Sequence, residues 1–306
     1  MNKISYEPAG QFEETRFEKI HNVIFESSYK ASLVVAQEIA NLIKDKSTQN
    51  TYCVLGLATG SSPIKVYEEL VRMHREEGLS FVNVISFNLD EYYPMEKSNV
   101  QSYDYFMHEH LFNHVDILPE NINIPDGMVS DEDLHQSCVD YEMKIKSVGG
   151  IDFQLLGIGR TGHIGFNEPG SHLNSGTRNI KLDHITRVDA APAFLGIDNV
   201  PVKAITMGIG TVNAAKRIVL LAWGANKAEI LKKTIEGDVT SNVPATYLQS
   251  HNNTTFVLDE GASEELTRVK TPWLVTSCVW SETLKLKAVL WLSELTNQSI
   301  LKLTDK

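Results

Sequence analysis

The sequence predicts an α/β fold, a doubly wound and mainly parallel sheet with helices on both faces. Three observations lead to it: short apolar runs recur along the chain, many of them stop at glycine-rich or polar turns, and segments with helical spacing separate them. Strands that alternate with helices form parallel crossover units. Because the 306 residues contain no repeat or low-complexity tract, we expect one main domain.

The first half of the chain supplies the opening strand and helix units. Apolar residues at three- and four-residue spacing predict a helix over 28–44. The apolar run 52–57 stops at a turn of small residues, which is typical of a buried parallel strand. The elements expected next are a helix over 63–75, a strand over 82–87, and helices over 103–111 and 131–146.

The second half continues the alternation. The expected strands are 153–156, 204–207, 218–222 and 254–258, and the expected helices are 227–236 and 245–251. Residues 28–260 therefore form the α/β domain. Residues 1–27 are expected to be an irregular leader with an apolar patch at 23–25. Residues 261–306, with a helix over 281–295, form a C-terminal appendage that either packs on this domain or leads to a further one.

Composition narrows the class of protein. The net charge of −11 does not favour a nucleic-acid partner, and no apolar run reaches the roughly 20 residues that a membrane span takes. The polar N-terminus does not resemble a signal peptide. Cys53, Cys138 and Cys278 lack the spacing of a disulfide framework or zinc site. We therefore expect a cytoplasmic protein without a metal.

A turn of small residues follows the first strand, where Thr59, Gly60, Ser61, Ser62 and Pro63 stand in a row. Pro63 suits the first helical position and Ser62 suits the N-cap. The N–H groups and positive end of a helix attract anions. The pattern lacks the Gly-Lys-Ser/Thr ending of a nucleotide-binding P-loop. It predicts either an anion site or an ordinary capped turn.

Two adjacent carboxylates, Asp90 and Glu91, follow the second strand. In an extended segment they point in different directions, so one can enter a cleft while the other caps a helix or stays in water. A carboxylate whose pKa is raised by burial can shuttle protons. The competing interpretation is a solvated acidic loop.

The stretch 157–170 is the most informative. Gly157, Gly159 and Gly162 match the dinucleotide fingerprint, but that fold needs a long helix at this turn, and Pro169 and Gly170 follow too soon. We therefore expect a tight functional turn.

His163 and Glu168 belong to the same stretch and lie close enough to face one pocket. Their spacing is wrong for a helical zinc motif. A histidine that is simply satisfied inside a loop is the competing interpretation.

Lys227 follows a strand and opens a helix. An ammonium group is unfavourable beside the positive end of a helix dipole. The position therefore indicates either a lysine that serves an anion or an ordinary surface lysine.

Taken together, these segments resemble the glucosamine-6-phosphate deaminase (isomerase) family over residues 30–260, in the family's order. Each motif alone is weak, and the ordered set is specific. The matching residues are Thr59-Gly60-Ser61-Ser62-Pro63, Phe87-Asn88-Leu89-Asp90-Glu91-Tyr92, Ser102-Tyr103-x-x-Phe106-Met107, Glu120-Asn121-Ile122-Asn123, Gly162-His163-Ile164-Gly165-Phe166-Asn167-Glu168-Pro169, Gly208-Ile209-Gly210-Thr211 and Gly224-x-x-Lys227-Ala228.

The resemblance implies a doubly wound α/β fold. It also implies conversion of glucosamine 6-phosphate and water to fructose 6-phosphate and ammonia, within amino-sugar metabolism and without a metal or organic cofactor. The resemblance implies that Asp90 moves a proton between C2 and C1 and that His163 is the base that opens the sugar ring. It also implies that Glu168 belongs to the same proton relay as His163. The implied phosphate and substrate contacts are Thr59, Gly60, Ser61, Ser62, Gly157 and Lys227.

Two positions depart from the family pattern. Thr161 stands where the familiar sequence has an aspartate that partners the histidine, and a hydroxyl can orient an imidazole without stabilising its cation. Loss of acid/base catalysis costs about 10²–10⁴-fold, although sugar phosphates also open spontaneously. The family's phosphate-clamping arginine aligns near Pro192, and Arg187 or Arg178 could replace it. Arg160 adds a positive charge beside the turn.

Two further interpretations stay open. One is a 6-phosphogluconolactonase-like hydrolase or isomerase, which shares the fold and a Gly-His turn. The other is a sugar-phosphate sensor without catalysis, motivated by Thr161 and Pro192. The segment around Trp273 looks like longer bacterial relatives with a deacetylase-like domain. Oligomeric state, including a homo-oligomer, and allosteric activation are not predicted by the sequence.

Overall fold

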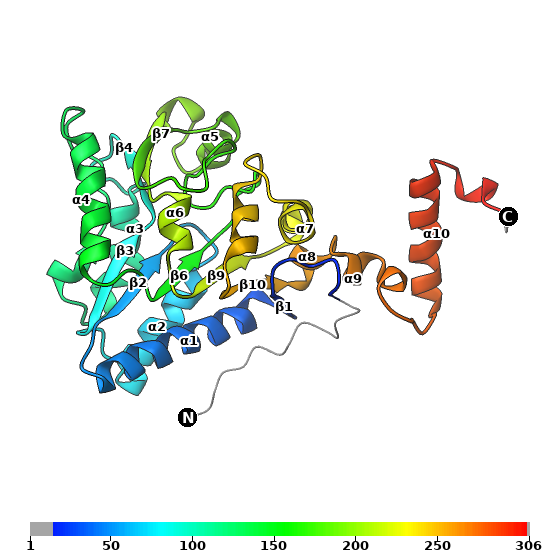
Figure 1. Cartoon of the computed structure of the whole chain (residues 1–306), viewed down its shortest axis with the longest axis horizontal. Coiled ribbons are helices and arrows are strands. Elements are labelled where there is room, and N and C mark those ends of the chain that lie inside the picture. The colour runs from blue at the N-terminus through cyan, green and yellow to red at the C-terminus, as the bar shows by residue number, and fades with distance from the viewer. Residues whose placement is uncertain (1–14, 305–306) are drawn as a thin grey trace.

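A seven-stranded parallel sheet forms the centre of the computed structural model (Figure 1), which describes residues 15–304. Its strands stand in the order β1-β10-β9-β6-β2-β3-β5. Their bounds are β1 Asn22–Phe25, β2 Cys53–Leu57, β3 Val84–Asn88, β5 Ile122–Asn123, β6 Phe153–Leu156, β9 Ile218–Ala222 and β10 Thr254–Asp259. The predicted fold class is confirmed.

Helices cover both faces of this sheet. On one face α1 Ser28–Thr48, α2 Ile64–Glu77 and α3 Tyr103–His110 contribute to one apolar core. On the other face α4 Leu134–Ser147, α6 Ile209–Asn213 and α7 Ala228–Glu236 contribute to a second. Consecutive strand residues alternate between the two cores: Leu55 and Leu57 enter the first, and Val54 enters the second. This two-sided burial explains why the strands are continuous apolar runs.

The connections place a switch point between β2 and β6. From β2 the chain moves to β3 and then β5 on one side, and it returns to β6 on the other side of β2. Open α/β sheets bind their ligands at the carboxyl ends of strands around such a point. The topology therefore predicts a cleft at the ends of β2, β3 and β6.

A small antiparallel sheet stands beside these carboxyl ends. It consists of β4 Asp90–Tyr93, β8 Lys203–Thr206 and β7 Arg178–Lys181, with β8 in the middle. In Figure 1, β4 and β7 lie at the top of the molecule, near α5 His184–Ala190. The strand predicted at 204–207 exists, but it belongs to this second sheet. The partner strands β4 and β7 carry charged and polar residues, so an apolar pattern did not reveal them.

Several elements begin or end a few residues from their predicted bounds, and three segments differ in the kind of structure they form or in how they begin. Residues 22–25 of the expected irregular leader form β1, which pairs in parallel with β10; residues 1–14 lie outside the described part of the chain. Helix α2 begins at Ile64, with Pro63 as its N-cap residue and no side-chain cap hydrogen bond, so Ser62 is not the cap. The segment predicted as a helix over 245–251 is a 3-10 helix, Pro244–Ser250.

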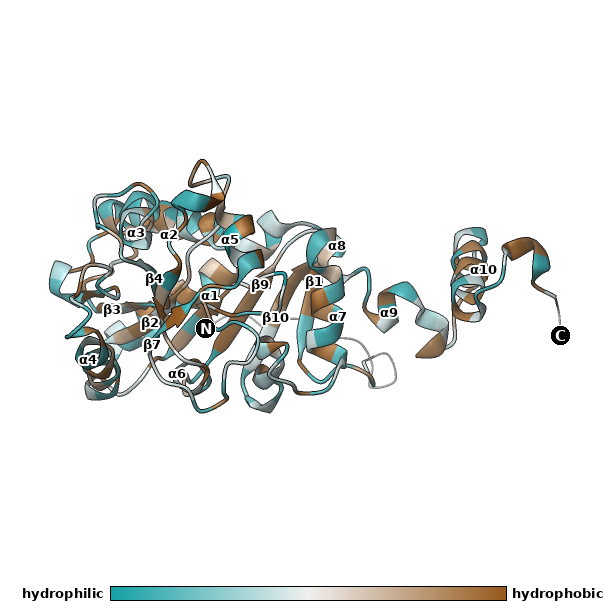
Figure 2. Cartoon of the chain, turned by 90° about the horizontal axis from the view of Figure 1, so that it is seen from above, coloured by the Kyte–Doolittle hydropathy of each residue, from teal (hydrophilic) through white to brown (hydrophobic). Residues whose placement is uncertain are grey.

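The C-terminal segment extends from the α/β body. The short helices α8 Glu260–Ser263 and α9 Thr267–Lys270 pack on it, whereas α10 Glu282–Thr296 stands apart (Figure 2) and has no buried residue. Trp273 stacks on Trp280 and meets Trp291 edge-on, each at 5.8 Å between ring centroids. The predicted division at residue 260 stays a prediction. Within residues 15–304, no helix is both long and apolar enough to span a membrane.

Asp152 joins three parts of the fold at the edge opposite the cleft. Its buried carboxylate accepts from Lys46 at 2.8 Å, from Lys216 at 2.7 Å and from the Val54 N–H at 3.0 Å. Burial alone would raise the pKa of Asp152, but the two lysines and the N–H group hold it below its ordinary value. The group therefore stabilises the fold above the unfolded-state pKa, and this contribution is lost as the pH falls through the folded-state pKa.

We expect Asp152→Asn to lower the free energy of unfolding by about 2–3 kcal/mol at pH 7, because charged hydrogen bonds are lost. Urea denaturation of both proteins from pH 7 to pH 3 measures this, and the difference should shrink with falling pH. Asp140→Asn, at an exposed carboxylate bonded to Gln136, is the matched control. Equal unfolding free energies at pH 7 would contradict the role given to Asp152.

Candidate active site

A polar cavity of about 220 Å³ lies at the carboxyl ends of β2, β3, β6 and β9, where the topology predicts a cleft. It gathers segments that are far apart in the sequence. Its lining residues are Ala58, Thr59, Gly60, Ser61, Ser62, Leu89, Asp90, Tyr103, Gly157, Ile158, Gly159, His163, Gly165, Phe166 and Lys227. Every predicted site residue lies here except Thr161, Glu168 and Arg187.

One end of the cavity is suited to an anion. The turn 58–62 leads into α2, whose first-turn N–H groups and dipole favour negative charge. Trp223 holds this turn by donating to the Ser62 carbonyl at 3.1 Å. The Lys227 ammonium, which follows β9, donates at 2.8 Å to the carbonyl of Ile158, which follows the neighbouring strand β6. An ammonium has three donors, so Lys227 can also bind an anion.

The electrostatic setting of Lys227 supports this use. It is the N-cap residue of α7 and comes at the end of the 3-10 helix Ala225–Lys227, as the sequence indicated. Burial lowers its pKa, and the nearby Arg160 adds to that effect, while Asp189 opposes it. A partly buried cation of this kind gains more from an arriving phosphate than a surface lysine does.

Asp90 and Glu91 divide their roles as the alternation of β4 requires. Asp90 is 5% exposed and lines the cavity. Burial, and next the charge of Glu91, raise the pKa of Asp90 well above its ordinary value. Glu91 does not line the cavity, and its carboxylate accepts hydrogen bonds from N–H groups in the first turn of α3. The prediction of one carboxylate in the cleft and one at a helix end is confirmed, and the interpretation as a solvated acidic loop is wrong.

His163 presents its ring to the cavity from a tight turn. Three oxygens surround its Nδ1 atom: Thr161 Oγ1 at 2.9 Å, Glu168 Oε2 at 3.3 Å and Thr186 Oγ1 at 3.5 Å. The Glu168 contact is an ion-pair distance without good hydrogen-bond alignment. In the sequence, Thr161 stands where the family has an aspartate that partners the histidine. In the structure, the carboxylate of Glu168 lies beside the same nitrogen of His163.

Glu168 is held as a carboxylate. Burial alone would raise its pKa, but His163, Thr186 and the Asp183 N–H lower it below the ordinary value. Its other oxygen accepts from that N–H at 3.2 Å. Because Nδ1 faces these oxygens, the Nε2 atom of His163 is the one available for proton exchange in the cavity.

Glycines make room for this histidine. A Cβ atom on Gly159 would stand 2.1 Å from the imidazole ring. Gly162 has a φ of +79°, and a Cβ there would approach Val243 to 2.5 Å. After Gly162 the chain enters no long helix, and the next regular element is β7. The prediction of a tight turn at this position, in place of a long helix, is therefore confirmed.

The arginines considered for phosphate binding are engaged elsewhere. Arg187 donates to the carbonyls of Ile197 at 2.8 Å and Val200 at 3.1 Å. Arg178 donates to Asn167 Oδ1 at 2.8 Å. Neither lines the cavity, so the structure does not bring the predicted Arg187 to the anion end. Arg160 forms an exposed ion pair with Asp189, and Pro192 is exposed.

Several site residues were missed by sequence reasoning. Tyr103 and Phe166 line the cavity, and Thr186 contacts the histidine. Tyr103 and Phe166 lie inside motifs of the family resemblance, but aromatic residues in apolar surroundings carry no chemical signal of their own. Thr186 comes from α5, which the sequence pattern did not predict.

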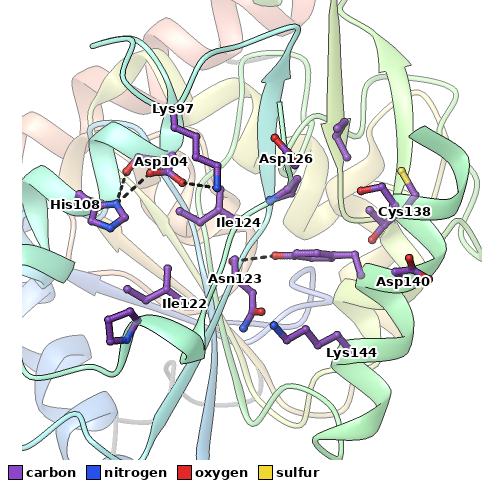
Figure 3. A pocket seen from close by; sticks show the side chains of 16 residues that line it. Lys97, Asp104, His108, Ile122, Asn123, Ile124, Asp126, Cys138, Asp140 and Lys144 are labelled. Carbon is purple, nitrogen blue, oxygen red and sulfur yellow. Dashed lines mark hydrogen bonds and ion pairs between the residues drawn. The ribbon is translucent and has the colours of Figure 1, made fainter. Parts of the chain in front are cut away.

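A larger cavity of about 580 Å³ lies elsewhere, between β5, α3 and α4. Figure 3 shows its mixed lining, in which Lys97, His108 and Asp104 face Lys144 and Asp140 across Ile122 and Ile124. No predicted site residue lines it. Among residues 15–304, no cluster of histidine, cysteine and acidic side chains could hold a metal ion. The cavity with His163 is the better candidate for catalysis, because Asp90, His163 and Lys227 line it together.

Comparison with known proteins agrees with this geometry. The family model described as glucosamine-6-phosphate isomerases/6-phosphogluconolactonase matches residues 26–257. The chain belongs to this family. The match includes Asp90, His163, Glu168 and Lys227 within one continuous stretch.

Relatives within this isomerase/lactonase family differ in length. A glucosamine-6-phosphate deaminase-like protein of Bacteroides thetaiotaomicron is 49% identical over 304 residues, 98% of this chain, but the match spans only 46% of that relative. A glucosamine-6-phosphate deaminase of Clostridioides difficile is 45% identical over 239 residues, 78% of this chain and 92% of its own length. The C-terminal segment is thus shared with the long relative.

Solved structures show the same fold. A monomeric glucosamine-6-phosphate deaminase superimposes with a TM-score of 0.77 at 40% identity and covers 80% of this chain and 100% of its own. The 6-phosphogluconolactonase of Trypanosoma brucei reaches a TM-score of 0.66 at 19% identity, which indicates a common fold alone. The nearer of these two likenesses is therefore to the deaminase.

Proposed function

We propose that this domain is a glucosamine-6-phosphate deaminase, which converts glucosamine 6-phosphate and water to fructose 6-phosphate and ammonia. The observation that carries the proposal is the meeting of Asp90, His163 and Lys227 in one cavity. These groups supply a proton shuttle, a ring-opening base and an anion ligand, the three parts that the reaction needs. The deaminases among the relatives support the same activity.

The phosphate is expected at the end of the cavity formed by the turn 59–62 and Lys227. Hydroxyl groups of Ser61 and Ser62, backbone N–H groups and the ammonium of Lys227 provide its donors. This anchoring places the sugar ring toward Asp90 and His163. It also makes part of the binding energy available for orienting the reacting carbons.

Ring opening is assigned to His163. Its Nε2 atom removes the proton of the anomeric hydroxyl and returns a proton to the ring oxygen as the C1–O5 bond breaks. The carboxylate of Glu168, 3.3 Å from Nδ1, stabilises the imidazolium that forms in between. Thr161 fixes the ring orientation through its 2.9 Å contact.

Isomerisation and deamination are assigned to Asp90. Its carboxylate removes the C2 proton of the open-chain aldehyde and delivers it to C1. One proton of the substrate's ammonium group passes to the aldehyde oxygen, which leaves a hydroxyl on C1 and an iminium at C2. Water adds to that carbon and ammonia leaves, giving the ketone of fructose 6-phosphate. The raised pKa of Asp90 suits it to both proton removal and delivery. The substrate's own ammonium group favours the carboxylate form when it binds.

We expect Glu168→Gln to lower kcat by about 10²-fold, since the imidazolium of His163 loses its countercharge. Thr161→Val should lower kcat by no more than about tenfold, because only a neutral hydrogen bond is lost. Steady-state kinetics of both variants with glucosamine 6-phosphate measure the difference. A larger loss for Thr161→Val would show that the hydroxyl, not Glu168, is the principal partner of His163.

The activity is tested by measuring ammonia and fructose 6-phosphate after incubation with glucosamine 6-phosphate. A parallel incubation with 6-phosphogluconolactone tests the lactonase alternative. Release of ammonia without lactone hydrolysis supports the proposal, whereas the reverse result contradicts it. A cytoplasmic location remains part of this proposal.

A further inference from the structure

Tyr103 occupies a central place in the cavity that the proposed reaction does not yet use. It is the first residue of α3, directly after the N-cap Ser102. Its ring stacks on Phe166, with 5.7 Å between centroids and 11° between planes. It also meets the ring of Tyr92 at 5.0 Å. The ring therefore connects β4, which begins with Asp90, to the turn that carries His163.

Tyr103 lines the cavity together with Asp90 and the turn assigned to phosphate. Its hydroxyl is within hydrogen-bonding reach of Thr59, in that turn, and of the Tyr92 hydroxyl. Burial raises the pKa of Tyr103 well above its ordinary value, followed by the effects of Tyr92 and Asp90. The phenol stays protonated at neutral pH and can both donate and accept a hydrogen bond.

Glu91 fixes the position of Tyr103. Its two carboxylate oxygens accept from the Tyr103 N–H at 3.0 and 2.9 Å, and one of them accepts from the Asp104 N–H at 3.0 Å. Glu91 is 2% exposed. A carboxylate at a helix N-terminus binds these N–H groups with charge-assisted hydrogen bonds. Glu91 therefore links the first turn of α3 to β4, next to Asp90.

We propose that Tyr103 is a further residue of the catalytic site, whose hydroxyl binds the sugar chain between the phosphate turn and Asp90, and that Glu91 is the positioning residue that holds it there. The proposal rests on the proposed function. Packing alone explains the ring of Tyr103, since it joins the aromatic cluster of Tyr92 and Phe166. Packing does not explain a phenol that reaches the cavity wall at Thr59.

Tyr103→Phe retains the ring and removes the hydroxyl. We expect kcat/KM for glucosamine 6-phosphate to fall about tenfold or more, because a hydrogen bond to the substrate is lost. The dissociation constant of fructose 6-phosphate, measured by calorimetry, should rise by a similar factor. That of inorganic phosphate should stay within twofold. Tyr105→Phe, on the same helix at a residue 40% exposed, should change none of these values.

The substitution Glu91→Gln tests the proposed role of Glu91 in positioning Tyr103. Its amide keeps one acceptor oxygen and loses the other, so α3 loosens while Tyr103 itself is unchanged. We expect the affinity for fructose 6-phosphate to fall and that for inorganic phosphate to persist.

Unchanged fructose 6-phosphate affinity in Tyr103→Phe, or an equal loss of phosphate affinity, would overturn the role of Tyr103. Unchanged affinity in Glu91→Gln would overturn the role of Glu91. Lack of ammonia release by the wild type counts against the proposed function, and the binding measurements still test Tyr103.

Discussion

Asp90→Asn should lower kcat with glucosamine 6-phosphate by about 10⁴-fold, at the upper end of what acid/base catalysis contributes. The loss is large because one carboxylate both removes the C2 proton and delivers it to C1. An asparagine has nearly the same shape but cannot carry that proton. Binding of fructose 6-phosphate should persist, because Asp90 lies at the reacting carbons and not at the phosphate end.

The measurement compares kcat and the calorimetric dissociation constant of fructose 6-phosphate in both proteins. Asp140→Asn, at an exposed carboxylate of α4, controls for loss of one negative charge. If Asp90→Asn turned over at the wild-type rate, another group would have to be the proton shuttle. We do not expect Asp90→Asn to destabilise the fold, because within residues 15–304 Asp90 forms no ion pair.

Gly159→Ala should lower kcat by about 10²–10³-fold, although the new methyl group touches no substrate. A Cβ at this position would stand 2.1 Å from the His163 ring, so the imidazole must move. Displacement of a catalytic group by about 1 Å can cost 10²-fold. The neighbouring Ile158 carbonyl, which accepts from Lys227, is also in this turn, and a shift of the backbone would add to the loss.

Gly176→Ala is the matched control, because its added Cβ meets nothing closer than Glu142 at 3.6 Å. Steady-state kinetics and thermal denaturation of both variants separate a local from a global effect. We expect Gly159→Ala to remain folded with a low kcat. Wild-type kcat in Gly159→Ala would show that His163 tolerates displacement and is not the ring-opening base.

Residue chemistry was sufficient to predict that these segments lie together at one candidate site. The small-residue turn, the carboxylate pair, the Gly-His turn and Lys227 each follow a parallel strand, and carboxyl ends of parallel strands meet at one edge of the sheet. The alternation of side chains along a strand also predicted that Asp90 and Glu91 would diverge. These are local or topological rules, and the sequence alone is sufficient to apply them.

Contacts made across the fold were less accessible. Arg187 was a reasonable phosphate ligand by charge, but its guanidinium donates to carbonyls of the segment that follows α5. The second sheet was missed since β4 and β7 are short and polar. Thr161 suggested a histidine without a carboxylate; only the folded chain shows Glu168 3.3 Å from the same nitrogen. These contacts join residues that are far apart in the sequence or depend on which carbonyl groups are free to accept, and local sequence rules do not predict them.

The central claim is that Asp90, His163 and Lys227 together perform deamination of a phosphorylated amino sugar. The most direct test is the stoichiometry of ammonia and fructose 6-phosphate released by the wild type from glucosamine 6-phosphate. We predict one ammonia for each fructose 6-phosphate, and no ammonia from glucosamine lacking the phosphate at the same concentration. Failure to release ammonia from glucosamine 6-phosphate, with hydrolysis of 6-phosphogluconolactone instead, would contradict the account.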